Sequence, residues 1–216
     1  HSTSDVVDDY SWTVSEALRT KAFWLVTMSS TVAVLSQSAV EFNLVPYLHD
    51  EANIPVAQAA GVLSASNFMA LASLGWGYIA NVLTPRRCMV GALTIAGGMV
   101  AYLFVVDSLA TAYLFGVLWG ACSLGVTLLG LMVLAEYFGR SSYGAISGTV
   151  APFIIAALGI GPLLGSVAHD LTGSHNGLHM AMVGANLLAA FLIFIARRPT
   201  VPNQSSDRSL LEVTNG

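Results

Sequence analysis

One acidic residue inside a long apolar stretch is the first candidate for chemistry. Glu41 lies in the apolar segment 23–48, and Gln37 stands one helical turn before it. A carboxylate within a bilayer costs a few kcal/mol unless it is protonated or paired. At about 1.5 Å per residue, Glu41 lies roughly 27 Å along a helix that starts at Phe23, near the outer interface. Two interpretations stay open: a solvated residue at the mouth, or a group that titrates protons or contacts a substrate.

A second set of polar side chains falls in two other apolar stretches. Asn67 lies near the middle of its stretch, with Ser64 about one turn earlier. Trp119, Ser123 and Thr127 recur every four residues, so a helix carries them as one stripe. A polar stripe is unfavourable against lipid and is expected to face protein or a water-filled cavity. Interhelical hydrogen bonding explains each residue alone. The candidate substrate pathway comprises Gln37, Glu41, Ser64, Asn67, Trp119, Ser123 and Thr127.

Glycine and proline residues mark a candidate hinge in the fifth apolar stretch. Pro162 lacks a backbone donor, Gly161 precedes it, and Gly165 lies one turn further on. Such a combination predicts a kink or hinge. Close helix packing explains the glycines equally well, because small residues let helices approach each other.

A charge network is a candidate latch. Glu136 lies one turn before Arg140, and an isolated surface pair of this kind contributes only some tenths of a kcal/mol. A network that also includes Arg86 and Arg87 from another loop would bridge two loops. It would then stabilise one conformational state of that side of the membrane.

The overall composition indicates which elements must position these residues. Of 216 residues, 55% are apolar and 9% are charged, against about 25% charged in ordinary soluble proteins. This composition argues against a soluble enzyme, and the net charge of −4 without a large basic patch argues against nucleic-acid binding. The apolar runs are long and do not alternate, which excludes a β-barrel. We therefore predict an all-α polytopic membrane protein.

Six spans of about 20 residues or more account for nearly the whole length. Residues 1–22 are expected to be a cytoplasmic lead-in with a short interfacial helix, which begins at the capping-box pair Thr13 and Glu16. Residues 23–198 form the transmembrane bundle, and 199–216 are a polar tail that we expect to be disordered. The predicted spans are 23–48, 56–83, 88–106, 109–138, 143–169 and 178–196.

The cations fix the expected topology. All eight Lys and Arg residues fall before the first span, between the second and third, between the fourth and fifth, or after the sixth. These segments share one side of the membrane, while the other loops carry acids and histidines. By the positive-inside rule, both termini are cytoplasmic, in a cell membrane of the plasma or inner type.

Several segments resemble the C-terminal half of a major facilitator superfamily transporter, most closely the monocarboxylate and oxalate/formate branch. Residues 12–24 and 43–48 are similar to the lead-in and the end of the seventh helix of that family. Residues 77–87 resemble its loop signature of Gly, Asp, Gly, Arg and Arg. Residues 135–148 and 161–173 resemble the tenth and eleventh helices. The resemblance covers nearly the whole chain.

This sequence differs from the family pattern at several positions. Asn81 stands where the loop signature usually has Asp, and Pro85 where it usually has Gly, which weakens a charge latch there. Carriers of this branch typically hold an anion with an Arg or Lys inside a helix, whereas every cation here falls outside the spans. The gating and hinge candidates are Gly77, Asn81, Arg86, Arg87, Glu136, Arg140, Gly161, Pro162 and Gly165.

The resemblance implies secondary active transport of a small solute, with an organic anion such as a monocarboxylate as one candidate and protons as a candidate coupling ion. The six helices would form two three-helix repeats, half of a twelve-helix fold, and would move against an N-terminal half or a second copy. The first, second, fourth and fifth spans would line the cavity. A chain that starts at His1 suggests a fragment with a missing N-terminal half, and a half-size carrier that acts as a homodimer stays open.

Other function classes fit less well. A serine protease dyad from Ser147 and His169 would need two residues about 33 Å apart on one helix to meet, so we do not expect an enzyme. The chain contains no Gly-x-x-x-x-Gly-Lys sequence, which argues against ATP hydrolysis on this chain. A permease subunit that works with a separate ATPase stays open. We expect no cofactor and no metal.

Overall fold

The computed structural model describes residues 12–139 and 142–200, and in this part of the chain all regular structure is helical. Six helical segments are long and apolar enough to cross a membrane. Every predicted span boundary lies within three residues of the observed one. The spans are α2 (Lys21–Asp50), the segment Val56–Val82, the segment Pro85–Val105, α6 (Leu109–Phe138), α7 (Tyr143–Thr172) and α8 (Asn176–Ile195).

Two of these spans contain more than one helical element. The second span consists of α3 (Val56–Met69), the 3-10 turn η1 (Ala70–Leu74) and α4 (Gly75–Val82). The third consists of α5 (Pro85–Tyr102) and the 3-10 turn η2 (Leu103–Val105). Before the first span lies the short helix α1 (Val14–Leu18).

The helix ends follow local sequence signals. Thr13 and Glu16 form the expected capping box of α1, with the Thr13 backbone N–H donating to Glu16 Oε2 at 2.9 Å. Ser108 caps α6 in the same way, with its side chain accepting from the backbone N–H of Thr111. At the C-terminal end of α7, Gly173 adopts φ +70°, a left-handed conformation that favours glycine.

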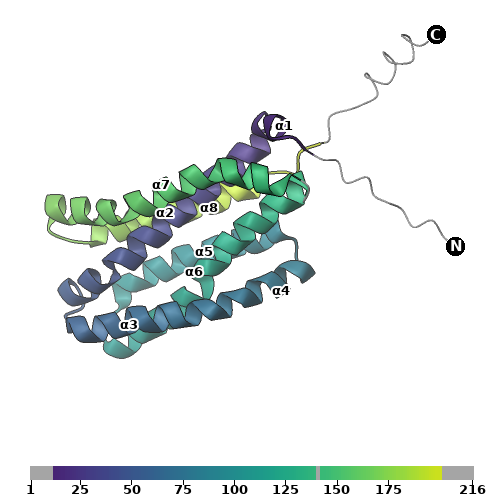
Figure 1. Cartoon of the computed structure of the whole chain (residues 1–216). Coiled ribbons are helices and arrows are strands. Elements are labelled where there is room, and N and C mark those ends of the chain that lie inside the picture. Colours follow the sequence, from purple (N-terminus) through teal and green to yellow (C-terminus); the bar gives the residue numbers. More distant parts are fainter. Residues whose placement is uncertain (1–11, 140–141, 201–216) are drawn as a thin grey trace, which may run out of the picture.

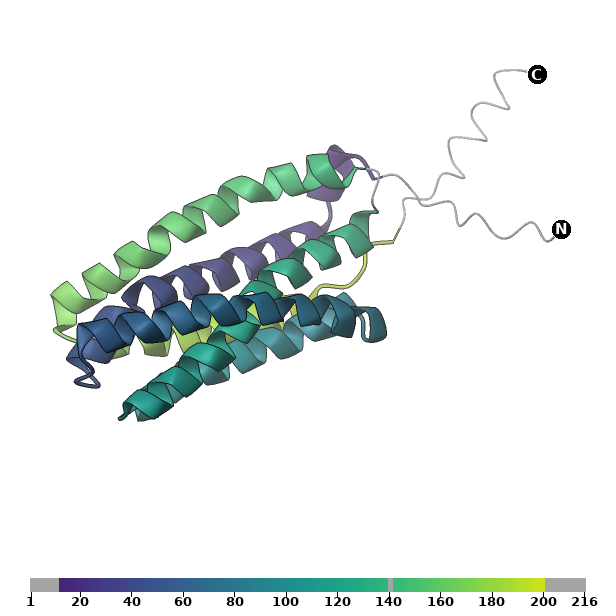
Figure 2. The ribbon, with the colours of Figure 1, turned by 60° about the horizontal axis from the view of Figure 1, so that its bottom comes forward.

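The six spans form two three-helix repeats whose helices interlock. The second helix of each repeat packs on the first helix of the other, so α7 lies along α2 and the α3–α4 segment lies along α6. The third helices, α5 and α8, pack on each other. Figure 1 shows α2, α7 and α8 toward one side of the bundle and α3 and α4 toward the other, and Figure 2 shows α6 crossing the bundle obliquely. The predicted all-α fold with six membrane spans is confirmed, and the pairing of the helices agrees with the expected repeats.

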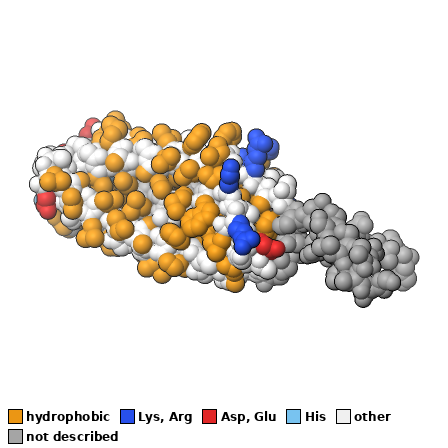
Figure 3. All heavy atoms as spheres, turned by 90° about the horizontal axis from the view of Figure 1, so that it is seen from above, with side chains coloured by type: hydrophobic (Ala, Val, Ile, Leu, Met, Phe, Trp, Pro, Cys, Tyr) orange, Lys and Arg blue, Asp and Glu red, His pale blue; other side chains and the backbone are white. Residues whose placement is uncertain are grey.

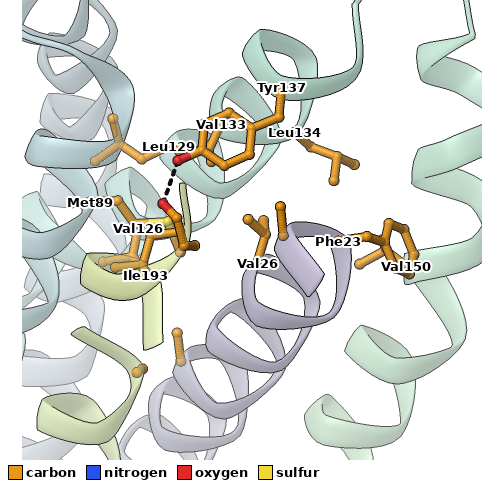
Figure 4. Packing of buried hydrophobic residues seen from close by; sticks show 14 of the residues in the cluster. Phe23, Val26, Met89, Val126, Leu129, Val133, Leu134, Tyr137, Val150 and Ile193 are labelled. Atoms are coloured by element: carbon orange, nitrogen blue, oxygen red, sulfur yellow. Dashed lines mark hydrogen bonds between the residues drawn. The ribbon is translucent and has the colours of Figure 1, made fainter. Parts of the chain in front are cut away.

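Two apolar clusters hold the bundle together. The first surrounds Phe23, Leu129 and Phe138, and Figure 4 shows this cluster between α2, α6, α7 and α8. Within it the Tyr137 hydroxyl donates to the Ala196 backbone oxygen at 2.7 Å. The second cluster, around Leu44 and Phe115, lies toward the opposite end of the bundle. Both clusters lie between the spans. Many other large apolar side chains lie outside these clusters, on the outer surface of the bundle.

That outer surface suits lipid. Phe68, Leu71, Tyr78, Leu163 and Leu171 all have more than 60% of their surface exposed. Figure 3 shows apolar side chains spread over the length of the visible face, with Lys and Arg gathered toward one end. A surface of this kind is unfavourable in water and favourable in a hydrocarbon core.

The cations of the described residues all mark one end of the bundle. Arg19 and Lys21 stand at the start of α2, Arg86 and Arg87 at the start of α5, and the pair 197–198 follows α8. Arg140 and Arg208 lie outside the described residues. The opposite end carries Asp50, Glu51, Asp107 and Asp170. This segregation agrees with the predicted topology, whose orientation remains a prediction.

Candidate functional site

A polar cluster lies between the first helices of the two repeats. Gln37 Nε2 on α2 donates to Glu41 Oε1 at 3.3 Å, so this side-chain pair is formed one turn apart on the same helix. Trp119 and Ser123 of α6 line a cavity together with Gln37, and its volume of about 10 Å³ is close to the space that one water molecule needs. The structure thus brings together four of the predicted pathway residues, from two helices that are distant in sequence.

Trp119 is the buried wall of this cluster. Its side chain is only 2% exposed and stacks on Phe115, with ring centroids 5.7 Å apart and planes at 16°. The indole Nε1 faces the Glu41 carboxylate, but within the described part of the chain neither Glu41 nor any other group meets the geometry of a full hydrogen bond to it. A buried indole N–H without a partner is costly. A bound solute or a rotation of Glu41 could satisfy it.

Asn186 belongs to the same cavity and was missed by the sequence reasoning. It lies on α8, is 2% exposed, and lines the cavity that Gln37, Trp119 and Ser123 share. Its Nδ2 donates to Ser36 Oγ at 2.6 Å and to the Met182 backbone oxygen at 2.8 Å. A lone Asn in the middle of the last apolar run was the available signal. Asn186 fixes α8 to α2 behind the candidate pathway.

The other predicted pathway residues lie elsewhere. Ser64 and Asn67 are both on an exposed face of α3, and Ser64 Oγ donates to the Ala60 backbone oxygen at 2.9 Å. Thr127 lines an apolar groove of about 280 Å³ between α2, α6 and α7 instead of the polar cavity. These three residues therefore do not contact the Gln37–Glu41 pair in this conformation. Whether a substrate meets them remains a prediction.

The predicted hinge region of α7 is a continuous helix. α7 runs from Tyr143 to Thr172 through Pro152 and Pro162, and its buried face includes Gly161 and Gly165. A Cβ at Gly161 would collide with Ser38, and a Cβ at Gly165 with the amide group of Asn43. The two glycines therefore serve close packing of α7 on α2 in this conformation. Motion about this point remains a prediction.

The span that departs from regular α-helix is the second one. The helix tightens to 3-10 geometry over Ala70–Leu74, although the span Val56–Val82 contains no proline. Just after that turn, the indole N–H of Trp76 donates to the Ala121 backbone oxygen at 3.0 Å, and the ring lies against Gly125. Mid-helix 3-10 segments often mark hinges. The sequence reasoning placed no break here.

The predicted gating residues have different partners from those expected. Arg86 donates to the backbone oxygens of Ile193 (3.2 Å) and Phe194, and its guanidinium lies 5.9 Å from the Phe194 ring centroid. Arg86 thus satisfies carbonyls at the end of α8. Within the described part of the chain, no ion pair joins Arg86 to Glu136.

The remaining gating candidates are less constrained. Glu136 Oε2 is buried without a hydrogen-bond partner among the described residues, and its expected partner Arg140 lies outside them. Asn81 and Arg87 are exposed. A Cβ at Gly77 would meet open space. The latch therefore remains a prediction, and the bonds of Arg86 show that this arginine also has a structural role.

Comparison with known protein families gives the decisive finding. The family model of the Major Facilitator Superfamily matches residues 24–213, which includes all six spans. The chain belongs to the major facilitator superfamily. A comparison with curated individual proteins found no match.

The match means that this major facilitator protein serves membrane transport of small solutes, with the lipid bilayer as the surroundings of its spans. The superfamily is a family of transporters, which is consistent with the expectation from the sequence that this chain is not an enzyme. In the structure, Ser147 and His169 lie on the same continuous helix α7, so the two cannot approach as a catalytic dyad.

Proposed function

We propose that this chain forms one six-helix half of a secondary carrier that works by alternating access, with the cavity around Gln37, Glu41, Trp119, Ser123 and Asn186 as its part of the solute pathway. The observation that carries the proposal is the Gln37–Glu41 pair, which faces the buried indole N–H of Trp119 on the other helix. Trp119 also packs on Phe115 in the apolar core, so the carboxylate of Glu41 is the group that packing does not require. It does suit a solute or a transferred proton.

Each residue has a distinct part in the proposed mechanism. Glu41 accepts from Gln37 and is the group that would take up a proton or contact a polar solute. The Trp119 N–H is available as a donor to the solute. Asn186 is already bonded to Ser36 and Met182, so it acts as a fixed wall rather than a ligand.

The proposed partner-facing helices are those whose surfaces are least buried within the chain. In the spans containing α3 and α7, only 22% of the most apolar window is buried, against 56% in α2 and α6. In the proposed carrier, an N-terminal six-helix half covers these exposed faces and completes the solute site. A second copy of the chain is the alternative partner, and crosslinking of the purified chain distinguishes the two.

The proposed solute class is a small organic anion such as a monocarboxylate, which rests on the family branch that the sequence resembles. All cations of the described residues stand at one end of the bundle, so the counter-charge for an anion would come from the partner half. A neutral solute is the alternative. Uptake assays with acids and neutral analogues of similar size separate these two classes.

The direct test is uptake by proteoliposomes that contain the full-length carrier. Glu41→Gln should remove uptake driven by an inward proton gradient while leaving solute exchange at equal pH. Asp107→Asn, an exposed acid in a loop, is the matched control and should behave as wild type. Unaltered gradient-driven uptake by the Glu41→Gln protein contradicts the role of Glu41.

The same vesicles test the remaining alternatives. Uptake without ATP is expected for a secondary carrier, whereas an ATP requirement would favour a permease subunit that docks on a separate ATPase. We also propose that both termini are cytoplasmic in a plasma or inner membrane. Arg87 and Asp107 occupy opposite ends of the bundle. With this topology, a membrane-impermeant thiol reagent should label a cysteine at position 107 in intact cells and a cysteine at position 87 only after the cells are permeabilised.

A further inference from the structure

A cluster of histidine and carboxylate side chains lies at the acidic end of the bundle, far from the polar cavity. Asp50 ends α2, His169 lies in the last turn of α7, and His175 lies in the connection between α7 and α8. One potential ligand atom from each residue lies within 4.8 Å of the other two. From this geometry we infer that Asp50, His169 and His175 form a binding site for a Zn²⁺ ion.

The distances suit a metal of this class. His175 Nε2 lies 3.4 Å from Asp50 Oδ2. Two ligands bound to one tetrahedral Zn²⁺ at about 2.0–2.1 Å are separated by roughly 3.3 Å. This pair therefore already has the spacing of neighbouring zinc ligands. A side-chain rotation of His169 brings the third donor into range, and water would complete the tetrahedron.

The ring nitrogens of His169 point to a missing ligand. Both are buried without a hydrogen-bond partner among the described residues. His175 is only 4% exposed. The two rings meet edge to face with centroids 4.5 Å apart. Buried imidazoles normally satisfy at least one nitrogen, so the unsatisfied His169 is explained if a metal occupies the space.

The surroundings hold the ligands in place. Glu51 Oε1 accepts from Ser174 Oγ at 2.5 Å and from the His175 backbone N–H at 3.2 Å, which fixes the α7–α8 connection on the end of α2. The His175 backbone oxygen also lies 2.9 Å from His179 Nδ1. Second contacts of this kind orient metal ligands. This end of the described chain carries acids and no Lys or Arg, which favours a cation.

The metal would connect two elements that the amino-acid sequence separates widely. Asp50 belongs to α2 of the first repeat, whereas His169 and His175 flank the end of α7 in the second repeat. Bound Zn²⁺ would clamp these helices at one mouth of the bundle. This inference concerns binding and does not depend on the proposed solute or coupling.

The test uses the purified full chain without a polyhistidine tag, titrated with zinc chloride in a calorimeter. We expect one equivalent of Zn²⁺ to bind and to raise the midpoint of thermal unfolding. Titration with cobalt chloride should produce the visible absorption bands of tetrahedral Co²⁺. His169→Gln and Asp50→Asn should each weaken zinc binding at least about tenfold.

The matched control is His49→Gln, since His49 is an exposed histidine at the same mouth and its ring contacts the Ile54 backbone oxygen instead. This variant should bind zinc as the wild type does. Both His169→Gln and Asp50→Asn change side chains that are not fully buried, and size-exclusion elution verifies that they remain folded. Absence of binding by the wild type, or wild-type affinity in both ligand variants, overturns the inference.

Discussion

The two helix crossings that the repeats share, α7 on α2 and α3 on α6, are built from different contacts. Where α7 meets α2, Gly165 of α7 faces the Asn43 side chain, and Gly161 faces both the Ser38 side chain and the Ala39 backbone nitrogen. Where α3 meets α6, Gly116 and Gly120 of α6 face the backbone of α3, and Gly61 of α3 faces the Tyr113 side chain of α6. Glycines thus come from one helix at the α2–α7 crossing and from both helices at the α3–α6 crossing.

The difference predicts different tolerance to change. Side chains can rotate away from an added methyl group, whereas a backbone carbonyl can move only with its helix. At Gly165 the α2–α7 crossing is therefore adjustable, whereas at Gly116 and Gly120 the α3–α6 crossing is fixed. Two prolines lie in α7, a helix of the adjustable crossing, and the 3-10 turn lies beyond α3.

The largest effect is expected for Gly120→Ala. Its Cβ would fall on the Ser66 backbone oxygen and within 3.0 Å of the Ser66 Cα. Overpacking against backbone should lower the free energy of unfolding by about 1–3 kcal/mol, measured by titration with SDS in mixed micelles. Gly98→Ala, which meets open space on α5, is the control and should not destabilise. Rescue of Gly120→Ala by Ser66→Gly would contradict a backbone clash.

A somewhat smaller loss is expected for Trp76→Phe. The substitution keeps an aromatic ring against Gly125 but removes the hydrogen bond from Nε1 to the Ala121 backbone oxygen. We expect a destabilisation of about 1 kcal/mol in the same titration. The exposed Tyr78 lies on the same short helix, and Tyr78→Phe should leave stability unchanged. Equal effects of the two substitutions would mean that the indole bond does not hold α4 on α6.

Gly165→Ala tests the adjustable crossing. Its Cβ would overlap the Asn43 amide, which donates from Nδ2 to the Ala39 backbone oxygen at 2.8 Å. Rotation of Asn43 relieves the clash at the cost of that bond, so we expect a loss of up to about 1 kcal/mol. The double variant with Asn43→Ala should be closer to wild type than the sum of the single effects. Strict additivity would contradict the proposed contact.

The smallest effect on stability is expected for Pro162→Ala. α7 already passes through this proline as a continuous helix, so the substitution should change the free energy of unfolding by less than about 0.5 kcal/mol. If α7 bends about Pro162 during transport, the same variant should lower the uptake rate in proteoliposomes. Unchanged uptake together with unchanged stability would remove the hinge hypothesis.

Hydropathy along the sequence was a good guide to the spans, but the spacing of polar residues was a weaker guide to what each helix face contacts. The apolar runs predicted every span, because a bilayer demands about 20 apolar residues whatever the neighbouring helices are. The polar stripe on α6 was correctly expected to face protein for Trp119 and Ser123, which are buried. Ser64 and Asn67 are instead exposed, since their surroundings depend on which helices cover α3.

The amino-acid sequence by itself determined the membrane class, the span boundaries and the charged end, because hydropathy and charge act locally along the chain. Only the tertiary structure decided which distant residues meet. It placed Trp119 beside Glu41, tied Arg86 to the end of α8, and brought Asp50, His169 and His175 together. The physical reason is that packing of one repeat on the other selects these neighbours, and sequence spacing within a helix carries no information about that packing.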